Sequence, residues 1–168
     1  YNGLTADFLE DLKNQKYDFT FCSRMDQEPL IDFIPVARQE LVVIVSPDHP
    51  LSDRTEIRLS ETLDYPQILF SRRSGLRPMI DKLFLACGKQ PDCIFEIDED
   101  QTIAGFVANG FGIAVVPNMP ILTNMHLKVI HITEANWERR FYIAYLKNRY
   151  RTPLAEEFLS YVKSHALI

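Results

Sequence analysis

The segment Leu41–Ser46 constrains the fold of this chain more than any other feature. It reads Leu-Val-Val-Ile-Val-Ser, an apolar run rich in β-branched residues and without polar alternation. Such a run is typical of a strand that is covered on both faces. Turn-forming residues from Pro47 to Pro50 follow it and end the strand. The fold must therefore place packed layers on both sides of this strand.

Strand and helix patterns alternate along the rest of the chain, which predicts β-α-β construction and an α/β fold. We expect the other strands over residues 17–23, 67–71, 93–97, 112–116, 127–131 and 140–146. We expect helices around residues 5–12, 76–87 and 98–110, with Thr5 as the candidate N-cap of the first. We also expect a helical turn at 60–63 and a loop that carries Pro29 and Pro35. The last helix has Thr152 as N-cap and Pro153 in its first turn, and its predicted apolar face is Leu154, Phe158, Tyr161 and Val162.

The stretch Val107–Pro117 reads as a helix end, a glycine turn and a buried strand. Gly110 suits the position after a helix C-terminus, where the backbone is often left-handed. Gly112 would allow a close turn before the strand. We expect this stretch to support the wall of a ligand cleft and to do no chemistry itself.

Composition limits the kinds of partner. With 168 residues the chain can form one domain or two small lobes, and a net charge of −5 argues against nucleic-acid binding by this piece alone. The three cysteines, Cys22, Cys87 and Cys93, lack zinc-site spacing, which favours reduced thiols in a cytoplasmic protein. A redox sensor is the alternative, with Cys22 near Arg24 as its candidate. No segment approaches the roughly 20 apolar residues of a membrane span.

The sequence contains no motif for catalysis or cofactor binding. There is no GxGxxG or P-loop, and the four histidines lack metal-ligand spacing. The acidic residues from Glu96 to Asp100 could serve acid–base catalysis or bind a cation. A strand end followed by a helix start is the favoured alternative, because the helix dipole stabilises acids there. We therefore expect no enzyme activity, no cofactor and no metal.

Ser71-Arg72-Arg73-Ser74 lies between a predicted strand and a predicted helix, where open α/β folds bind ligands. Backbone N–H groups of the helix start, the serine hydroxyls and one arginine would suit a carboxylate or a phosphate. An ordinary N-cap with a solvated basic loop is the equally weighted alternative. Thr102, at the entry of the next helix, would offer a second hydroxyl or cap its own helix. Cys22 and Ser23, at a strand end, would line the same cleft or have core and loop roles.

Several segments, in this order, resemble the effector-binding domain of LysR-type transcriptional regulators. They cover nearly the whole chain and are residues 12–19, Glu40–Leu51, Phe106–Pro117, Arg140–Lys147, and Thr152–Ala155 with Phe158. Each motif is weakly specific alone, but their order and intervals together are specific. The turn before Tyr17 departs from the family, which usually has glycine there. This chain has Gln15-Lys16, and we expect Asn14 to take the left-handed conformation instead.

The resemblance implies a type 2 periplasmic-binding-protein-like fold, with two Rossmann-like lobes joined by hinge strands. Lobe I would comprise residues 1–41 and 144–168, and lobe II residues 42–143. A small effector, anionic if Arg72 and Arg73 contact it, would bind between the lobes, sensed by Ser71–Ser74 and Thr102. The full-length cytoplasmic protein would form a homodimer or tetramer. It would bind DNA through an N-terminal winged helix-turn-helix domain that this chain lacks.

The resemblance also implies that the first strand and helix of the family precede Tyr1, which would leave lobe I incomplete and with an exposed sheet edge. Two other functions stay open. An extracytoplasmic solute-binding protein would have the same fold and would be preceded by a signal peptide. An enzyme on this scaffold would need a catalytic acid, base or metal in the cleft.

Overall fold

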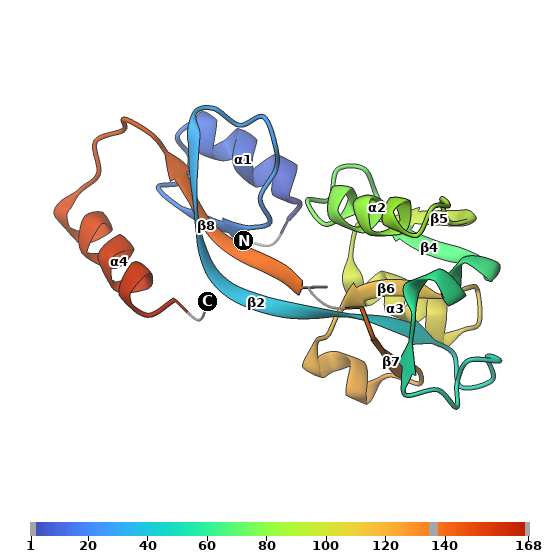
Figure 1. The fold of residues 1–168 in the computed structure, drawn as a ribbon. Coiled ribbons are helices and arrows are strands. Elements are labelled where there is room, and N and C mark those ends of the chain that lie inside the picture. Colours follow the sequence, from blue (N-terminus) through green and yellow to red (C-terminus); the bar gives the residue numbers. More distant parts are fainter. Residues whose placement is uncertain (1–2, 135–137, 167–168) are drawn as a thin grey trace. The chain divides into compact units, whose positions relative to one another are not determined.

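The computed structural model describes residues 3–134 and 138–166. The chain forms two compact units (Figure 1). Unit 1 combines Tyr1–Gln39 with Arg139–Ile168, and unit 2 is the continuous segment Glu40–Glu138. Strand β2 (Ile31–Val45) carries the chain from unit 1 into unit 2, and strand β8 (Glu138–Leu146) returns it to unit 1.

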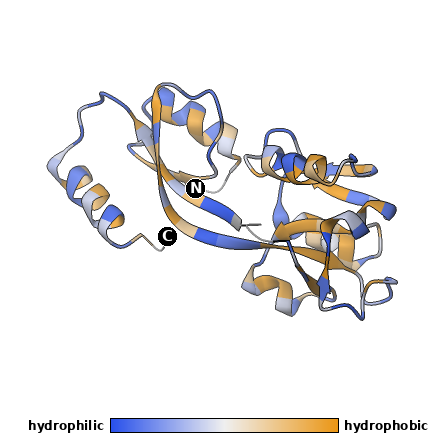
Figure 2. Ribbon diagram, viewed as in Figure 1, coloured by the Kyte–Doolittle hydropathy of each residue, from blue (hydrophilic) through white to orange (hydrophobic). Residues whose placement is uncertain are grey.

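Strand β2 is longer than predicted. The sequence predicted a strand at Leu41–Ser46 and a loop around Pro35, but the strand begins at Ile31 and passes through Pro35. Proline is tolerated there because β8 is the described neighbour of this half of β2, while β6 and β7 pair with β2 only from Leu41 onward. Figure 2 shows a hydrophilic break within β2, where the sequence has Arg38-Gln39-Glu40.

The described part of unit 1 packs helices α1 (Thr5–Lys13) and α4 (Pro153–Ser164) with strands β1 (Thr20–Cys22), β8 and the first half of β2. β1 pairs antiparallel with β8, so that Thr20 lies opposite Ala144. One apolar cluster of unit 1 joins α1 to the strands and consists of Leu9, Leu12, Cys22, Ile31 and Ala144. A second cluster joins α4 to β8 and consists of Leu159, Ile143 and Tyr145.

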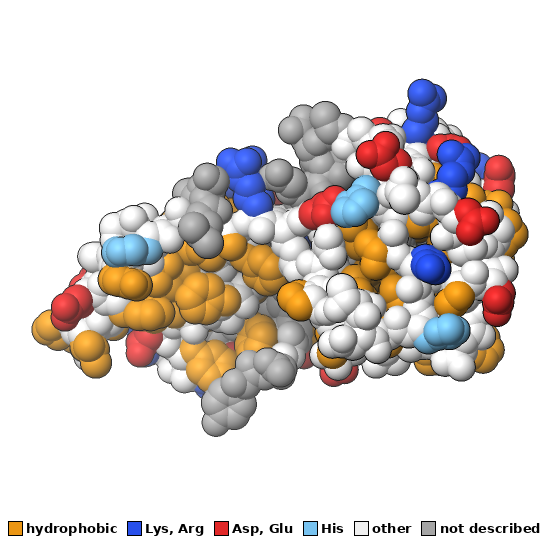
Figure 3. Space-filling view, turned by 90° about the horizontal axis from the view of Figure 1, so that it is seen from below, with side chains coloured by type: hydrophobic (Ala, Val, Ile, Leu, Met, Phe, Trp, Pro, Cys, Tyr) orange, Lys and Arg blue, Asp and Glu red, His pale blue; other side chains and the backbone are white. Residues whose placement is uncertain are grey.

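Helix α4 begins as predicted but turns a different face to the core. The hydroxyl of Thr152 accepts a hydrogen bond from the N–H of Ala155 at 3.3 Å, which confirms the N-cap. The buried residues are Ala155 and Leu159. Of the predicted apolar face, Val162 packs against the second cluster, but the other three residues are exposed: Leu154 at 76%, Phe158 at 42% and Tyr161 at 61%. Figure 3 shows hydrophobic side chains gathered over unit 1.

Two local predictions about the backbone of unit 1 are wrong. Asn14 has an ordinary φ of −79°, and Gln15 takes the left-handed conformation with φ of 60°. Thr5 is the first residue of α1, and the N-cap position belongs to Leu4, without a capping hydrogen bond from its side chain. Both errors shift a helix boundary by one residue and leave the predicted helix in place.

Unit 2 is built around the second half of β2. Leu41–Val45 is fully buried between the antiparallel neighbours β6 (Ala114–Pro117) and β7 (Lys128–Ile132). β3 (Glu56–Ile57) pairs parallel with β7, and β4 (Gln67–Phe70) pairs parallel with β5 (Cys93–Ile97). The helical segments are η1 (Leu59–Asp64), α2 (Arg77–Ala86), α3 (Asp100–Ala108) and η2 (Pro120–Asn124). Ile80, Phe84, Ile103 and Val107 bring α2 and α3 into the same core as β2.

The stretch Val107–Pro117 has the predicted helix end, turn and buried strand. Gly110 follows α3 with a left-handed φ of 76°. Gly112 lies where a Cβ would come within 2.9 Å of the carbonyl oxygen of Pro66. The N–H of Ile113 donates to that oxygen at 3.0 Å, and the N–H of Ile68 donates to the carbonyl of Ile113 at 2.8 Å. The stretch therefore joins β4 to β6. Within the described ranges, no helix is long and apolar enough to cross a membrane.

Candidate functional site

The loop Ser71–Ser74 lies at the carboxyl end of β4 and leads into α2, as predicted. The N–H of Ser71 extends the β4–β5 ladder by donating to the carbonyl of Ile97 at 2.9 Å. The chain then turns, and the N–H of Ser74 donates to the carbonyl of Ser71 at 3.0 Å. The hydroxyl of Ser74 accepts a hydrogen bond from the N–H of Leu76 at 3.2 Å. Ser74 thus caps the turn that starts α2.

The start of α2 offers fewer backbone donors than the sequence indicated. The N–H of Leu76 is bonded to Ser74, and the N–H of Arg77 donates to the Ser74 carbonyl at 3.2 Å. Pro78 has no N–H to give. A ligand at this loop would therefore depend mainly on side chains rather than on the helix N-terminus.

The hydroxyl of Ser71 is shielded from solvent and has no hydrogen-bond partner among the described residues. A buried polar atom without a partner costs about 1–3 kcal/mol. Such atoms are rare in native folds and need an explanation, for which a bound ligand is one candidate. The same loop carries two exposed cations, Arg72 and Arg73. A loop that carries a hydroxyl and two guanidinium groups holds donors of the kinds that suit a hydroxylated carboxylate.

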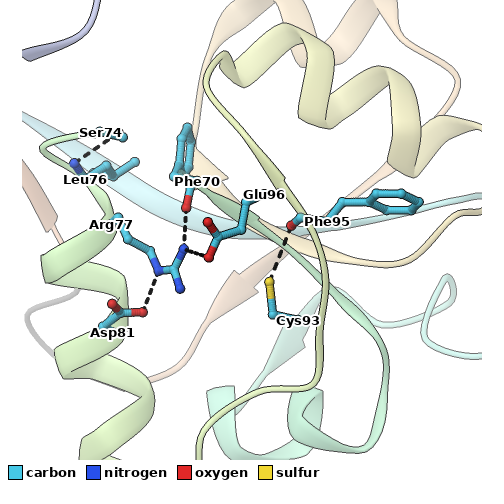
Figure 4. A network of polar contacts seen from close by, with 8 residues as sticks. All are labelled: Phe70, Ser74, Leu76, Arg77, Asp81, Cys93, Phe95 and Glu96. Atoms are coloured by element: carbon cyan, nitrogen blue, oxygen red, sulfur yellow. Dashed lines mark hydrogen bonds and ion pairs between the residues drawn. The ribbon is translucent and has the colours of Figure 1, made fainter. Parts of the chain in front are cut away.

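Arg77, which follows the loop, is not an exposed cation like Arg72 and Arg73. Arg77 is the first residue of α2, and its side chain is only 7% exposed. Its Nε donates to Oδ1 of Asp81 at 2.8 Å. Its Nη1 donates to Oε1 of Glu96 and to the carbonyl oxygen of Phe70, each at 2.7 Å (Figure 4). One guanidinium therefore ties α2 to the ends of β4 and β5.

The charges of this network are internally compensated. Burial alone would lower the pKa of Arg77, but its hydrogen bonds to Glu96 and Asp81 raise it. The hydrogen bond from Arg77 in turn lowers the pKa of Glu96. The spacing of Arg77 and Asp81, four residues apart on a helix, was a visible signal for this pair. Glu96 lies on strand β5, far from Arg77 in the sequence, so the local sequence did not predict this contact.

Helix α3 starts at the same edge of the β4–β5 pair as α2, because β5 ends at Ile97, beside Ser71. Thr102 is exposed in the first turn of α3, and its contact with a ligand stays a prediction. Asp100 also lies in that turn, where the helix dipole favours an acid. With Glu96 bound to Arg77, the acidic cluster fits the structural alternative. Within the described ranges, no group of three His, Cys, Asp or Glu side chains could hold a metal ion.

Cys22 and Ser23 belong to unit 1 and are buried; Cys22 is the last residue of β1, and Ser23 follows it. Burial raises the pKa of the Cys22 thiol to about 12, although Arg139 acts in the opposite direction. Such a thiol stays protonated at neutral pH, which argues against the redox-sensor hypothesis. The hydroxyl of Ser23 accepts a hydrogen bond from Nε of Arg139 at 3.2 Å. Their part in a ligand site stays a prediction.

Comparison with known proteins identifies relatives over the whole chain. A family model described as the LysR substrate binding domain matches residues 1–167. The chain is 36% identical over 157 residues to the uncharacterized HTH-type transcriptional regulator YybE of Bacillus subtilis (strain 168), which covers 94% of this chain and 54% of YybE. It is 26% identical over 166 residues to the HTH-type transcriptional activator CmpR of Synechocystis sp., which covers 97% of this chain and 55% of CmpR. The chain thus spans about half the length of these curated relatives.

Solved structures share the fold. The effector binding domain of QuiR in complex with shikimate matches with a TM-score of 0.96 and 38% identity, over 99% of this chain and 79% of that chain. The regulatory domain of Synechocystis CcmR in complex with 2-PG matches with a TM-score of 0.83 and 23% identity, over 98% of this chain and 80% of that chain. The predicted α/β fold of the periplasmic-binding-protein-like type is confirmed.

Proposed function

Because the chain belongs to the family of LysR substrate-binding domains, we propose that its Ser71–Ser74 loop binds the effector that controls a LysR-type transcriptional regulator. We further propose that this effector is a small hydroxylated carboxylate. The observation that carries the proposal is the solvent-shielded Ser71 hydroxyl without a partner, at the carboxyl end of β4. The named relatives are transcriptional regulators, which favours this function over a solute-binding protein of the same fold.

The ligand class follows from the groups that the loop presents. Ser71 offers a hydroxyl that can donate to or accept from a ligand hydroxyl, and Arg72 and Arg73 carry the positive charge that a carboxylate needs. Arg77 does not contribute charge, because Asp81 and Glu96 compensate it. Shikimate, a hydroxylated ring carboxylate, is bound in the QuiR structure and is the natural first probe.

Thermal unfolding with and without shikimate tests the proposal. A ligand at a hundredfold excess over its Kd stabilises the folded state by about 2.7 kcal/mol, which raises Tm by roughly 5–10 °C in a domain of this size. Ser71→Ala should reduce that shift, while Ser60→Ala, an exposed serine of unit 2 on η1, should keep it. Shikimate methyl ester, which lacks the negative charge, should give a smaller shift than the acid.

Two results would contradict the proposal. The first is that Tm stays unchanged when hydroxylated carboxylates, including shikimate, are added at millimolar concentration. The other is a Ser71→Ala variant that binds shikimate as tightly as the original chain. A ligand that binds equally well as the acid and as the methyl ester would contradict only the proposal that the effector is an anion.

For the full-length protein we propose a cytoplasmic homodimer or tetramer that contacts DNA through a separate helix-turn-helix domain. The names of the relatives as HTH-type regulators and the half-length coverage support this proposal. We also propose that units 1 and 2 correspond to lobes I and II, with boundaries at 39 and 139 rather than the predicted 41 and 144, and that lobe I is incomplete. The end position of β1 in the strand order β1–β8–β2 supports the incomplete lobe, since one edge of β1 has no described neighbour. Light scattering and DNA-binding assays on the full-length protein would test these points.

A further inference from the structure

Arg77 lies at a position where a positive charge does not stabilise the helix. It is the first residue of α2, at the positive end of the helix dipole, where acids are stabilising and bases are not. Its side chain is also buried, which is unfavourable for a charge unless partners compensate. Its place at the start of α2 therefore does not by itself explain this arginine, whose hydrogen bond to the Phe70 carbonyl lies at the end of β4.

The peptide group between Phe70 and Ser71 is hydrogen-bonded on both sides. Its carbonyl, which belongs to Phe70, accepts from Nη1 of Arg77 at 2.7 Å. Its N–H, which belongs to Ser71, donates to the carbonyl of Ile97 at 2.9 Å. A planar peptide held at both polar atoms rotates little, so the direction in which the Ser71 side chain leaves the backbone is set. Figure 4 shows Arg77 reaching the Phe70 carbonyl while Asp81 and Glu96 hold the guanidinium.

We propose that Arg77 is a positioning residue of the effector site, which fastens the Phe70–Ser71 peptide so that the Ser71 hydroxyl is presented to the effector. The statement about the effector rests on the proposed function, whereas the statement about the peptide does not. Arg77 does not touch the effector, since its contacts to Asp81, Glu96 and Phe70 are internal to unit 2. The planar guanidinium suits this task because it donates in several fixed directions at once, which a lysine ammonium on a flexible stem does not do.

A double-mutant cycle with Arg77→Lys and Ser71→Ala distinguishes positioning from a general effect on stability. Arg77→Lys keeps the positive charge between the two carboxylates but loses the fork geometry. Calorimetric titration with shikimate, at a temperature where each variant is fully folded, should show roughly fivefold or greater weakening by Arg77→Lys. In the Ser71→Ala background the same change should have no further effect, because the group being positioned is gone. Arg54→Lys is the matched control, since Arg54 pairs with Glu61 at 2.9 Å in the same unit.

Two binding results would overturn the proposal. The first is an Arg77→Lys variant whose affinity for shikimate equals that of the original chain. The second is an equal loss in both backgrounds, which would assign Arg77 a structural role only. Shikimate and its methyl ester should also lose affinity in the same proportion, because Arg77 does not pair with the carboxylate.

Amide hydrogen exchange tests the peptide directly and needs no ligand. The Ser71 amide should exchange roughly tenfold faster or more in Arg77→Lys, while the Ile68 amide, bonded to Ile113 at 2.8 Å, should not change. An unchanged Ser71 amide would refute the positioning role even if shikimate proves not to bind, in which case only the effector class has failed. If Arg77→Lys does not fold, Asp81→Ala removes one support of the guanidinium, and the same two amides decide the question.

Discussion

Replacing Gly112 by alanine should destabilise unit 2, because the backbone at this position passes close to Pro66. The added Cβ would lie 2.9 Å from the carbonyl oxygen of Pro66 and 3.1 Å from Cδ1 of Ile94, where ordinary contacts begin at 3.4 Å. The side chain of Ile94 can turn away, but the oxygen belongs to the backbone and also accepts the N–H of Ile113 at 3.0 Å. The Pro66 segment must therefore move by about half an ångström and strain that hydrogen bond.

The size of the effect follows from these two contributions. Overpacking of a well-packed site costs about 1–3 kcal/mol, and a weakened backbone hydrogen bond adds about 1 kcal/mol. We therefore expect Gly112→Ala to lower the free energy of unfolding by about 2–4 kcal/mol. Gly105 is the matched control, because it lies inside α3 and an added Cβ would meet nothing within 4 Å. Alanine there should stabilise the chain by about 0.5–1 kcal/mol through helix propensity.

Urea unfolding followed by far-UV circular dichroism measures both variants against the original chain. Gly112→Ala should shift the midpoint to lower urea, and Gly105→Ala should shift it to higher urea, with unchanged slopes. The reasoning is refuted if Gly112→Ala loses less than about 0.5 kcal/mol, which is the size of a neutral surface substitution. It is also refuted if both glycines respond alike.

Three further predictions concern single side chains. A thiol reagent at pH 8 should label the exposed Cys93 and leave Cys22 unlabelled until the chain unfolds, because burial raises the pKa of Cys22 to about 12; equal labelling of both in the folded state would contradict this. Burial alone would raise the pKa of Glu40, but the hydrogen bond with His131 at 2.6 Å lowers it below its usual value. The resulting stability is present above the unfolded pKa of about 4.3 and is lost as the pH falls through the lowered folded pKa. It should amount to less than about 0.5 kcal/mol, since both side chains are roughly half exposed, and Glu40→Gln should abolish this pH dependence in acid unfolding curves. Thr152→Ala should lower the free energy of unfolding by about 1 kcal/mol through loss of the α4 cap, and an unchanged urea midpoint would show that the cap contributes nothing.

The periodicity of apolar residues and the positions of glycine and proline predicted most helices and strands of unit 2. Leu41–Val45 is a strand because its residues are apolar on both faces, and Gly110 ends α3 because it can adopt positive φ. The same rules missed the first half of β2, since proline usually stops a strand. Pro35 is accommodated because the N–H that proline lacks is not required on a side of β2 without a described partner. That depends on strand order, which local sequence does not contain.

The phase of α4 shows a second limit. The helix carries two apolar stripes, one through Leu154 and Phe158 and one through Ala155 and Leu159. Helical periodicity recognises both stripes but does not say which one faces the sheet. Contact with Ile143 and Tyr145 of β8 selects Leu159 and leaves Leu154 and much of Phe158 exposed. Side-chain size alone would have favoured the opposite choice.

The sequence predicted where the Ser71–Ser74 loop lies in the fold but not the contacts of its side chains, and its role in effector binding stays a prediction. A loop at the carboxyl end of a strand located Ser71–Ser74, and that location is a general property of α/β sheets. The sequence did not separate the roles of its two serines: the hydroxyl of Ser74 accepts the N–H of Leu76 in the turn before α2, whereas that of Ser71 has no described partner. It also did not reveal Arg77 as buried, because Glu96 reaches it from β5. These properties arise from contacts between elements and become visible only in the folded chain.

The division of the chain into a discontinuous unit 1 and a continuous unit 2 has a consequence for synthesis on the ribosome. Residues 1–39 emerge before unit 2, but β1 pairs with β8, which begins only at Glu138. Among the described residues, the strands β3 to β7 and the second half of β2 precede Glu138, so unit 2 can fold while residues after it are still being translated. Helix α1 and strand β1 are therefore made before unit 2 but find their β8 partner only after it.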